Sequence, residues 1–416
     1  MTRPPVALTR DRDFLKLWAA QAVSSFGARI TREGLPMTAI LALGAGPGVL
    51  GILAALSYGP AVLVGLAGGG FVDRRRRRPI LIGADLVRAG VLITLPIAAW
   101  FHLLSLWQVF AAALLVGAAS VLFDMADHAY LPGLIGTERL VDGNSRLSAT
   151  ESVAEMGGPA LAGLLFQLFS APFAIALNAA TYLVSAFFLT RIGKAEPAPQ
   201  PAAPQPWARD LTQGLRTAWA EPRVRPLLAI ALCNGLFGGG FAALYLLFAL
   251  RTLGLTPAML GLTVACGGIG ALLGAGLAAP LARRLGAGPA ILILALAAAA
   301  SAMLIPLAPA APVAGMVLLI VSQLLGDAAG VAYGVLSASL RQTVLPQDSL
   351  GRAAGAFQAA TGGTLLIGAL IGGALGGLIG VRETLFLAAA GLALGPLIAL
   401  ASPALRGVKA IAVEAG

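Results

Sequence analysis

A series of long apolar stretches limits what this chain can fold into more than any other feature of its sequence. Residues 49–72 and 290–307, for example, contain no charged side chain, and a helix of roughly 20 apolar residues is what crosses a bilayer core. Across the chain 58% of residues are hydrophobic and 11% are charged, against about a quarter charged in soluble domains. The stretches do not alternate with a period of two, so helices are favoured over a β-barrel. We therefore predict an all-α integral membrane protein.

Glycine, proline and clusters of charge divide the apolar stretches into twelve predicted transmembrane helices. A segment rich in Pro, Ala and Gln, followed by a short amphipathic helix, separates the first six from the last six. The predicted organisation is a six-helix bundle at 1–192, a cytoplasmic linker at 193–225 and a second six-helix bundle at 226–416. The predicted spans are 15–43, 49–72, 79–101, 106–131, 141–168, 172–189, 226–250, 258–281, 290–307, 313–340, 353–379 and 384–402.

The distribution of Lys and Arg predicts the orientation of these spans. Of the 28 Lys and Arg residues, 23 fall at the two termini, in the linker and in alternate loops, whereas only Arg251 and Arg382 fall in the opposite loops. Because cytoplasmic loops carry the excess of Lys and Arg, we expect both termini on the cytoplasmic side of the inner membrane.

The arginine block in GGGFVDRRRRRPIL, residues 68–81, lies between the second and third predicted spans. Five basic residues between two membrane helices offer too little surface to fill a groove of nucleic acid. We expect no nucleic-acid partner, and the block is interpreted first as an anchor that fixes the orientation.

The same block follows a more specific spacing, because five of its residues match the pattern G-x-x-x-D-R-x-G-R-R with Arg76 in place of the second Gly. These residues are Gly69, Asp73, Arg74, Arg77 and Arg78. The spacing resembles the conserved loop of the major facilitator superfamily. A copy without the Asp, GLAAPLARRLG at 276–286, stands at the matching place in the second half. The resemblance implies the fold of that superfamily, with two pseudo-symmetric six-helix bundles.

Three further stretches resemble one branch of the superfamily, the drug and proton antiporters that include macrolide exporters and the enterobactin exporter. Residues 123–165 are similar to helices four and five of that branch, and GGPALAG at 157–163 partly resembles its signature G-P-x-x-G-G. Residues 337–357 are similar to the junction of helices ten and eleven. These motifs indicate an exporter and do not indicate its substrate.

The resemblance also implies a conformational latch at the cytoplasmic side. In the family the loop Asp is held against the start of helix eleven, and the arginines pair with acids on helix four. Carried over, Asp73 would cap the helix near 352–355, because a carboxylate is favoured at a helix N-terminus. Arg74, Arg77 or Arg78 would meet Asp124 or Asp127, and Asp85 and Arg88 share a face that could join them. A static ion-pair network is the alternative.

Charged residues within the predicted spans are the strongest indication of function, since each costs at least about 2.5–3.5 kcal/mol at the bilayer centre unless it is paired or hydrated. Arg29 and Glu33 share a face of the first span, with Arg32 beside them, and Glu151 and Glu155 share a face of the fifth. We expect Arg29 or Arg32 to pair with Glu151 or Glu155, leaving a carboxylate free to carry a proton. Glu33, followed by Glu155, is the predicted proton carrier. A closed structural network that never changes its charge is the alternative.

The second half contains fewer charges. Asp327, predicted near the middle of the tenth span, either carries a second proton or binds a cationic group of the substrate, and a hydrogen bond between helices is the alternative. Several polar and aromatic residues are candidates to line a substrate cavity or else only pack against neighbouring helices. They are Asn178, Asn234, Phe237, Tyr245 and Gln323.

No nucleotide-binding loop of the form G-x-x-x-x-G-K-S/T occurs in the sequence, so the energy for transport is expected to come from an ion gradient or from the substrate itself. We predict a monomeric secondary transporter without cofactor, metal or catalytic residue. It would export a drug-like, siderophore-like or amphipathic compound by alternating access, in exchange for protons, with its site between the two halves. Symport or uniport of a metabolite is the alternative on the same fold, and a non-transporting receptor or an intramembrane enzyme is the alternative of another class.

Overall fold

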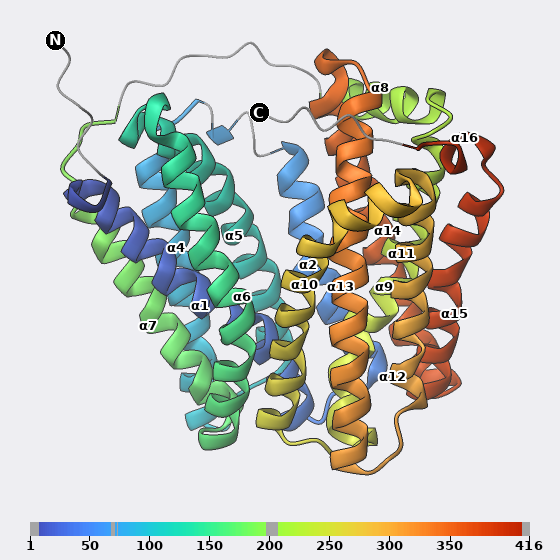
Figure 1. Cartoon of the computed structure of the whole chain (residues 1–416). Coiled ribbons are helices and arrows are strands. Elements are labelled where there is room, and N and C mark those ends of the chain that lie inside the picture. Colours follow the sequence, from blue (N-terminus) through green and yellow to red (C-terminus); the bar gives the residue numbers. More distant parts are fainter. Residues whose placement is uncertain (1–7, 68–70, 73, 197–206, 410–416) are drawn as a thin grey trace, which may run out of the picture. The chain divides into compact units, whose positions relative to one another are not determined.

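The computed structural model describes residues 8–67, 71–72, 74–196 and 207–409 (Figure 1). The regular elements in these ranges are all helices, which confirms the all-α prediction. Contacts divide the chain into two units, one made of Met1–Gly44 with Gly59–Pro204 and the other of Ala45–Tyr58 with Gln205–Gly416.

The first unit contains five long helices and two short 3-10 turns. They are η1 (Leu8–Arg10), α1 (Arg12–Leu41), α4 (Arg77–Trp100), α5 (Leu106–Ile135), η2 (Thr137–Arg139), α6 (Leu140–Leu168) and α7 (Ala171–Thr190). The start of α1 is fixed by Asp11, whose carboxylate accepts hydrogen bonds from the backbone amides of Asp13 and Phe14 at 3.2 Å. Such a cap satisfies amides that have no partner within the helix.

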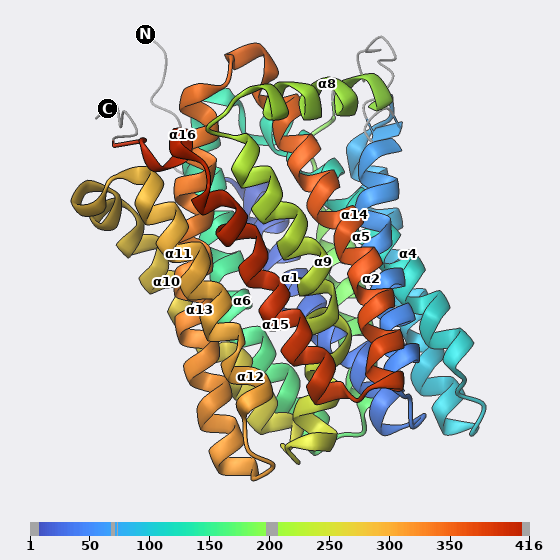
Figure 2. The same cartoon turned by 90° about the vertical axis from the view of Figure 1, so that its right-hand side faces the viewer.

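The second unit is built from longer and shorter helices around its own core. They are α8 (Trp207–Ala220), α9 (Arg225–Leu247), the π-helical turn η3 (Phe248–Thr252), α10 (Pro257–Leu285), α11 (Ala287–Ala302), α12 (Leu304–Leu307), α13 (Pro312–Val344), η4 (Gln347–Ser349), α14 (Leu350–Leu378), α15 (Val381–Leu400) and α16 (Pro403–Arg406). Figure 2 shows α8, in the second part of the predicted linker, lying crosswise over the ends of α9 and α14.

The remaining helix, α2 (Pro47–Ala67), is divided between the units. Its first part belongs with the second unit because Gly51 packs directly on α14, where a Cβ at Gly51 would lie 2.6 Å from the carbonyl oxygen of Ala369 and 2.9 Å from the Cα of Gly373. Small residues of this kind allow membrane helices to approach closely. The division by contacts therefore differs at this helix from the division at residue 192 that the sequence predicts.

Ten helical segments in the described part of the chain are long and apolar enough to cross a membrane. Two further helices, α1 with 30 residues and α6 with 29, match them in length. At about 1.5 Å per residue each is longer than the roughly 30 Å hydrocarbon core, but their charged residues lower their hydropathy. The prediction of twelve spans therefore depends on α1 and α6, the two helices that carry the predicted proton carriers.

Candidate functional site

The candidate site of the first unit is an ion-pair network between α1 and α6. Arg29 forms an ion pair with Glu155, and the Nη2 of Arg32 lies 3.3 Å from the other carboxylate oxygen of Glu155. The Nε of Arg32 also lies 3.4 Å from Glu33. The structure thus brings together four of the residues that the sequence singled out, and a single carboxylate, Glu155, receives both arginines.

The four charges of this network balance when all are ionised, since two arginines face two glutamates. Glu33 is buried, with 9% of its surface exposed, whereas the side chain of Glu155 is 45% exposed. Binding of one proton by either carboxylate would leave a net charge of +1 among these four groups. Glu151, one turn earlier on α6, is exposed and lies outside the ion pairs in the described structure.

A glycine on α6 makes room for this network. A Cβ at Gly158 would lie 2.7 Å from both Cβ and Cγ of Arg29, closer than real Cβ contacts, so the aliphatic part of Arg29 occupies the space that a side chain would take. Gly158 belongs to the GGPALAG stretch at 157–163. This stretch therefore has a local role in positioning Arg29 beside Glu155.

Asn178, a candidate for the substrate cavity, is fully buried on α7. Its amide donates to the hydroxyl of Thr31 on α1, and its carbonyl oxygen accepts from the hydroxyl of Thr181 at 2.8 Å. In this structure Asn178 thus joins α1 to α7, one residue from Arg32 on α1.

Asp85 and Arg88 form a second ion pair in the first unit, buried within α4. The guanidinium of Arg88 lies 4.4 Å from the ring centre of Phe123 and 4.2 Å from that of Tyr182, distances at which a cation is attracted by an aromatic face. A buried pair of this kind needs such compensation because both charges lose water. The sequence spacing placed Asp85 and Arg88 on one face of the helix, but it contained no indication of the two rings.

The predicted latch residues have other partners in this structure. Asp127 accepts a hydrogen bond from the side-chain amide of Gln21, and Asp124 is exposed, with its backbone oxygen 2.7 Å from the Nδ1 of His128. Arg74 is also exposed. Gly69 and Asp73 lie outside the described residues, so the predicted cap of helix α14 by Asp73 stays a prediction.

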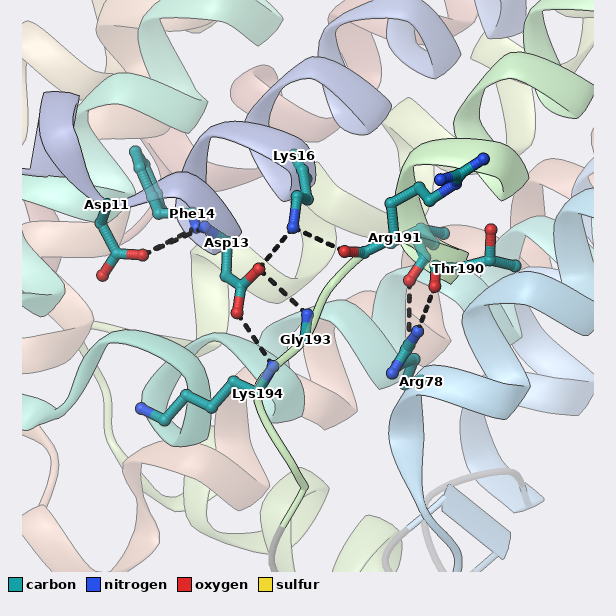
Figure 3. Close-up of polar contacts among 10 residues, drawn as sticks. Asp11, Asp13, Phe14, Lys16, Arg78, Thr190, Arg191, Gly193 and Lys194 are labelled. Atoms are coloured by element: carbon teal, nitrogen blue, oxygen red, sulfur yellow. Dashed lines mark hydrogen bonds and ion pairs between the residues drawn. The ribbon is translucent and has the colours of Figure 1, made fainter.

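Arg77 and Arg78 contact the segment that follows α7 instead of Asp124 or Asp127. The carboxylate of Glu196 accepts from the backbone amide of Arg77 at 2.6 Å and from that of Arg78 at 3.1 Å. The guanidinium of Arg78 donates to the carbonyl oxygens of Leu189, at 2.9 Å, and Thr190, at 2.6 Å (Figure 3). Glu196 thus caps the N-terminus of α4, and its Oε1 also lies 3.8 Å from the Nη1 of Arg77. The predicted pairing of these arginines with Asp124 or Asp127 stays a prediction.

Asp13 ties the start of α1 to the same segment, as Figure 3 shows. It accepts from Lys16 at 2.8 Å and from the backbone amides of Gly193 and Lys194 at 3.0 and 2.9 Å. Asp13 precedes the predicted span 15–43. Burial would raise the pKa of its carboxyl group, but these hydrogen bonds outweigh burial and hold the pKa below its ordinary value.

In the second unit the structure brings Asp327 and Gln323, both on α13, to Gly267 on α10. A Cβ at Gly267 would overlap the Oδ2 of Asp327 and would lie 3.6 Å from the Cβ of Gln323. The absence of a side chain at Gly267 therefore makes space for the carboxylate between the two helices, at the place where the sequence predicted a charge within a span.

The three candidate cavity residues of α9 differ in their surroundings. Asn234 is exposed, whereas the ring of Phe237 occupies the space next to Gly391 on α15. Tyr245 is half-buried. Phe237 thus takes part in helix packing. Among the described residues no three His, Cys, Asp or Glu side chains gather in a way that would hold a metal ion.

Sequence reasoning missed Glu196, although it is the residue that caps α4. Little in the sequence indicated this contact, because Glu196 lies among Pro and Ala residues of the linker and is separated from Arg77 by 119 residues. The nearby Lys194, whose Nζ donates to the carbonyl oxygen of Leu134 at 2.6 Å, was missed for the same reason.

Solved structures of several membrane transporters have a similar fold. A bacterial homologue of the iron transporter ferroportin, in an inward-facing state, aligns with a TM-score of 0.76 at 16% identity over 95% of this chain and 99% of that one. The nucleoside transporter NupG aligns with a TM-score of 0.77 at 14% identity over 94% and 98%. At these identities the likeness concerns the fold alone.

The family model described as "Transmembrane secretion effector" matches residues 4–415, and the chain belongs to this family of the major facilitator superfamily. It is a transport protein and not an enzyme. Macrolide efflux protein A of Streptococcus pyogenes is 31% identical over 168 residues, a match that spans 40% of each chain. Enterobactin exporter EntS of Shigella dysenteriae serotype 1 is 28% identical over 82% of this chain and 79% of its own. The MFS-type transporter YfiS of Bacillus subtilis is 26% identical over 89% and 88%.

Proposed function

We propose that this protein exports a small organic compound from the cell by alternating access, in exchange for protons, with both termini in the cytoplasm. The single observation that carries the proposal is the pairing of Glu155 with Arg29 and Arg32 beside the buried Glu33. Charged side chains within a membrane-spanning helix are costly, and they mark the pathways of ions or substrates. The direction of transport is supported by the relatives named for macrolide efflux and enterobactin export.

Protons are the proposed coupling ion because the network changes its net charge by one on binding a proton. With Glu33 or Glu155 protonated, one guanidinium loses part of its compensation and is free to rearrange or to meet an anionic group of the substrate. An inward-moving proton releases about 2.3 kcal/mol per 100 mV of membrane potential, which corresponds to a concentration ratio of roughly fiftyfold at about 1.4 kcal/mol per factor of ten.

Proteoliposomes test the proposal directly. The purified protein would be reconstituted with a pH-sensitive dye inside and loaded with a radiolabelled macrolide or with enterobactin, the compounds in the names of the relatives. We expect substrate efflux to depend on an imposed pH gradient and to move protons in the opposite direction. Substrate movement without any dye response would contradict antiport and favour uniport.

Three variants localise the coupling. Glu155→Gln and Glu33→Gln keep the shape of each side chain and remove its charge, and each is expected to abolish the dye response. Glu138→Gln makes the same chemical change at an exposed position in η2 and should transport like the wild type. If the first two variants kept full proton-coupled transport, Glu33 and Glu155 would form a structural network only.

A further inference from the structure

A second carboxylate, that of Asp124 on α5, lies beside the buried ion pair of Asp85 and Arg88. The Nη1 of Arg88 donates to the hydroxyl of Ser120 at 3.4 Å, and its guanidinium lies 4.4 Å from the ring centre of Phe123. Asp124 directly follows Phe123 and stands one turn beyond Ser120 on the same face of α5. The charge of Arg88 acts on both carboxylates. Arg88 thus contacts Asp85 and lies against the turn of α5 that carries Asp124.

The charges of these three groups do not balance when all are ionised. Arg88 supplies one positive charge, whereas Asp85 and Asp124 supply two negative charges. The side chains of Asp85 and Arg88 are 0% and 3% exposed, so water does not compensate them, while Asp124 is exposed. An unbalanced charge within a span is costly, and two carboxylates that share one site favour the binding of a proton by the pair.

The neighbouring helices add no permanent positive charge to this group in the part of the chain that the structure describes. The other titratable groups that act on the two carboxylates or on Arg88 are His128 on α5, Glu151 on α6 and Tyr182 on α7. Glu151 adds a further negative charge, and a phenol such as that of Tyr182 is neutral where a carboxylate titrates. Arg88 is therefore the one permanent cation among them, because an arginine stays protonated in proteins.

The buried end of the ion pair has room for a proton. The Oδ2 of Asp85 is buried and lies outside hydrogen-bond geometry, as does the hydroxyl of Ser185 beside it on α7. Buried polar atoms are nearly always satisfied, and a protonated carboxyl group would donate to that hydroxyl. The rings of Phe123 and Tyr182 attract the guanidinium of Arg88 whichever carboxylate it contacts.

We propose that Asp85 and Asp124 bind one proton between them, and that Arg88 contacts whichever of the two carboxylates is ionised. In this structure Arg88 contacts Asp85, so the proton belongs on Asp124, which is exposed and takes it up from water. When the guanidinium moves to Asp124, the proton belongs on Asp85 and is donated to Ser185. A use of this proton as a second coupling site rests on the proposed proton exchange, whereas its binding does not.

Infrared spectroscopy of the full chain in liposomes, without substrate, tests the proposal independently of transport. Aspartate labelled with ¹³C in its side-chain carboxyl group separates the signals of Asp from those of Glu33 and Glu155. We expect a labelled band of a protonated carboxyl group that disappears as the pH is raised from about 5 to about 9. Asp85→Asn and Asp124→Asn each leave one carboxylate for one guanidinium. Each variant should therefore lose the same component of this band, since the proton belongs to the pair.

The double variant Asp85→Asn/Asp124→Asn separates a shared proton from two independent ones. It should lose no more of the band than either single variant loses. Asp142→Asn is the matched control, because Asp142 is exposed and has its own partner, the Nε of Arg146 at 3.0 Å; its band should equal that of the wild type. Asp85→Glu restores a carboxylate and should restore the bound proton, in labelled or unlabelled form, which a purely structural role of Asp85 does not predict.

Two results would overturn the proposal. One is a band that neither Asp85→Asn nor Asp124→Asn changes. The other is a loss in the double variant that equals the sum of two separate losses, since each carboxylate would then titrate by itself. If Asp85→Asn does not fold, Asp124→Asn at its exposed position and Asp85→Glu still decide the question: the band component should be lost in the first and kept in the second, and the opposite result in either one contradicts the shared proton.

Discussion

The carboxylate of Glu196 accepts a hydrogen bond from the backbone amide of Arg77 at 2.6 Å, so a residue of the central linker caps α4, the second long helix of the first unit. The amides at the start of a helix have no partners within it, and the helix dipole favours a negative charge there. The linker therefore does more than join two bundles, because its first residues hold the end of α4 in place.

Replacement of Glu196 by Gln should lower the stability of the protein. The amide keeps one acceptor oxygen but loses the charge at the helix terminus, and we expect a loss of about 1 kcal/mol in the free energy of unfolding. Thermal unfolding in detergent measures it, with Glu138→Gln as the control at an exposed position. Equal Tm values for the two variants would show that the cap does not stabilise α4.

Variants of Arg29 and Glu155 can separate the contribution of this ion pair to stability from its role in proton coupling. Glu155→Gln leaves Arg29 without its carboxylate and should destabilise the protein, by less than the ~3–5 kcal/mol of a fully buried pair because Glu155 is half exposed. The double variant Arg29→Gln/Glu155→Gln removes both charges and should recover much of the lost Tm without recovering proton coupling. Recovery of coupled transport in the double variant would assign the proton to another residue.

Gly158→Ala should destabilise α1 against α6. The added methyl group would lie 2.7 Å from two carbons of Arg29, and forced overpacking costs typically about 1–3 kcal/mol. Gly157→Ala is a matched control on the same helix, since its methyl group would meet Phe26 at 3.7 Å, an ordinary contact. A thermal shift of the same size in both variants would mean that helix propensity, and not the contact with Arg29, sets the effect.

Gly267→Ala should displace the carboxylate of Asp327, because the new Cβ would overlap its Oδ2. Gly276→Ala lies on the same helix, with no heavy atom within 4 Å of the added carbon. We expect transport in proteoliposomes to fall severalfold in the first variant and to stay at the wild-type level in the second. Full transport in Gly267→Ala would exclude a positional requirement for Asp327.

The stability contributed by Asp13 should depend on pH. Its pKa is lowered in the folded state, so the contribution is complete above the pKa of the unfolded chain, about 4, and is lost as pH falls through the folded pKa. Tm of the wild type should therefore exceed that of Asp13→Asn at pH 7, and the difference should shrink progressively below about pH 4. A difference that stays constant down to pH 3 would show that the ionised form of Asp13 is not what stabilises the contact.

Much of the fold was predictable because hydropathy is a local property that adds up along the chain. The helices found in the structure follow the predicted spans closely, and the charges within α1 and α6 were recognised from their residue types alone. Their partners were harder to predict. Sequence spacing placed Arg29 and Glu33 on one face, but the contact of both arginines with Glu155 depends on how α1 and α6 are rotated against each other.

Residues at the ends of helices show most clearly which contacts could not be predicted from the sequence. The arginine block suggested partners on helix four, following the family pattern, yet in this structure Arg77 and Arg78 contact Glu196, Leu189 and Thr190. A capping contact across more than a hundred residues leaves no periodic trace in the sequence. The same holds for Arg88, whose aromatic neighbours Phe123 and Tyr182 come from two other helices.

The sequence by itself determined that this protein is a helical membrane protein, where its apolar helices run and which of them carry charge, because each of these follows from the composition of a short window. Only the tertiary structure decided which carboxylate meets which arginine, that Asn178 is buried, and that Glu196 closes the end of α4. Those contacts depend on the rotation, register and close approach of helices that are distant along the chain.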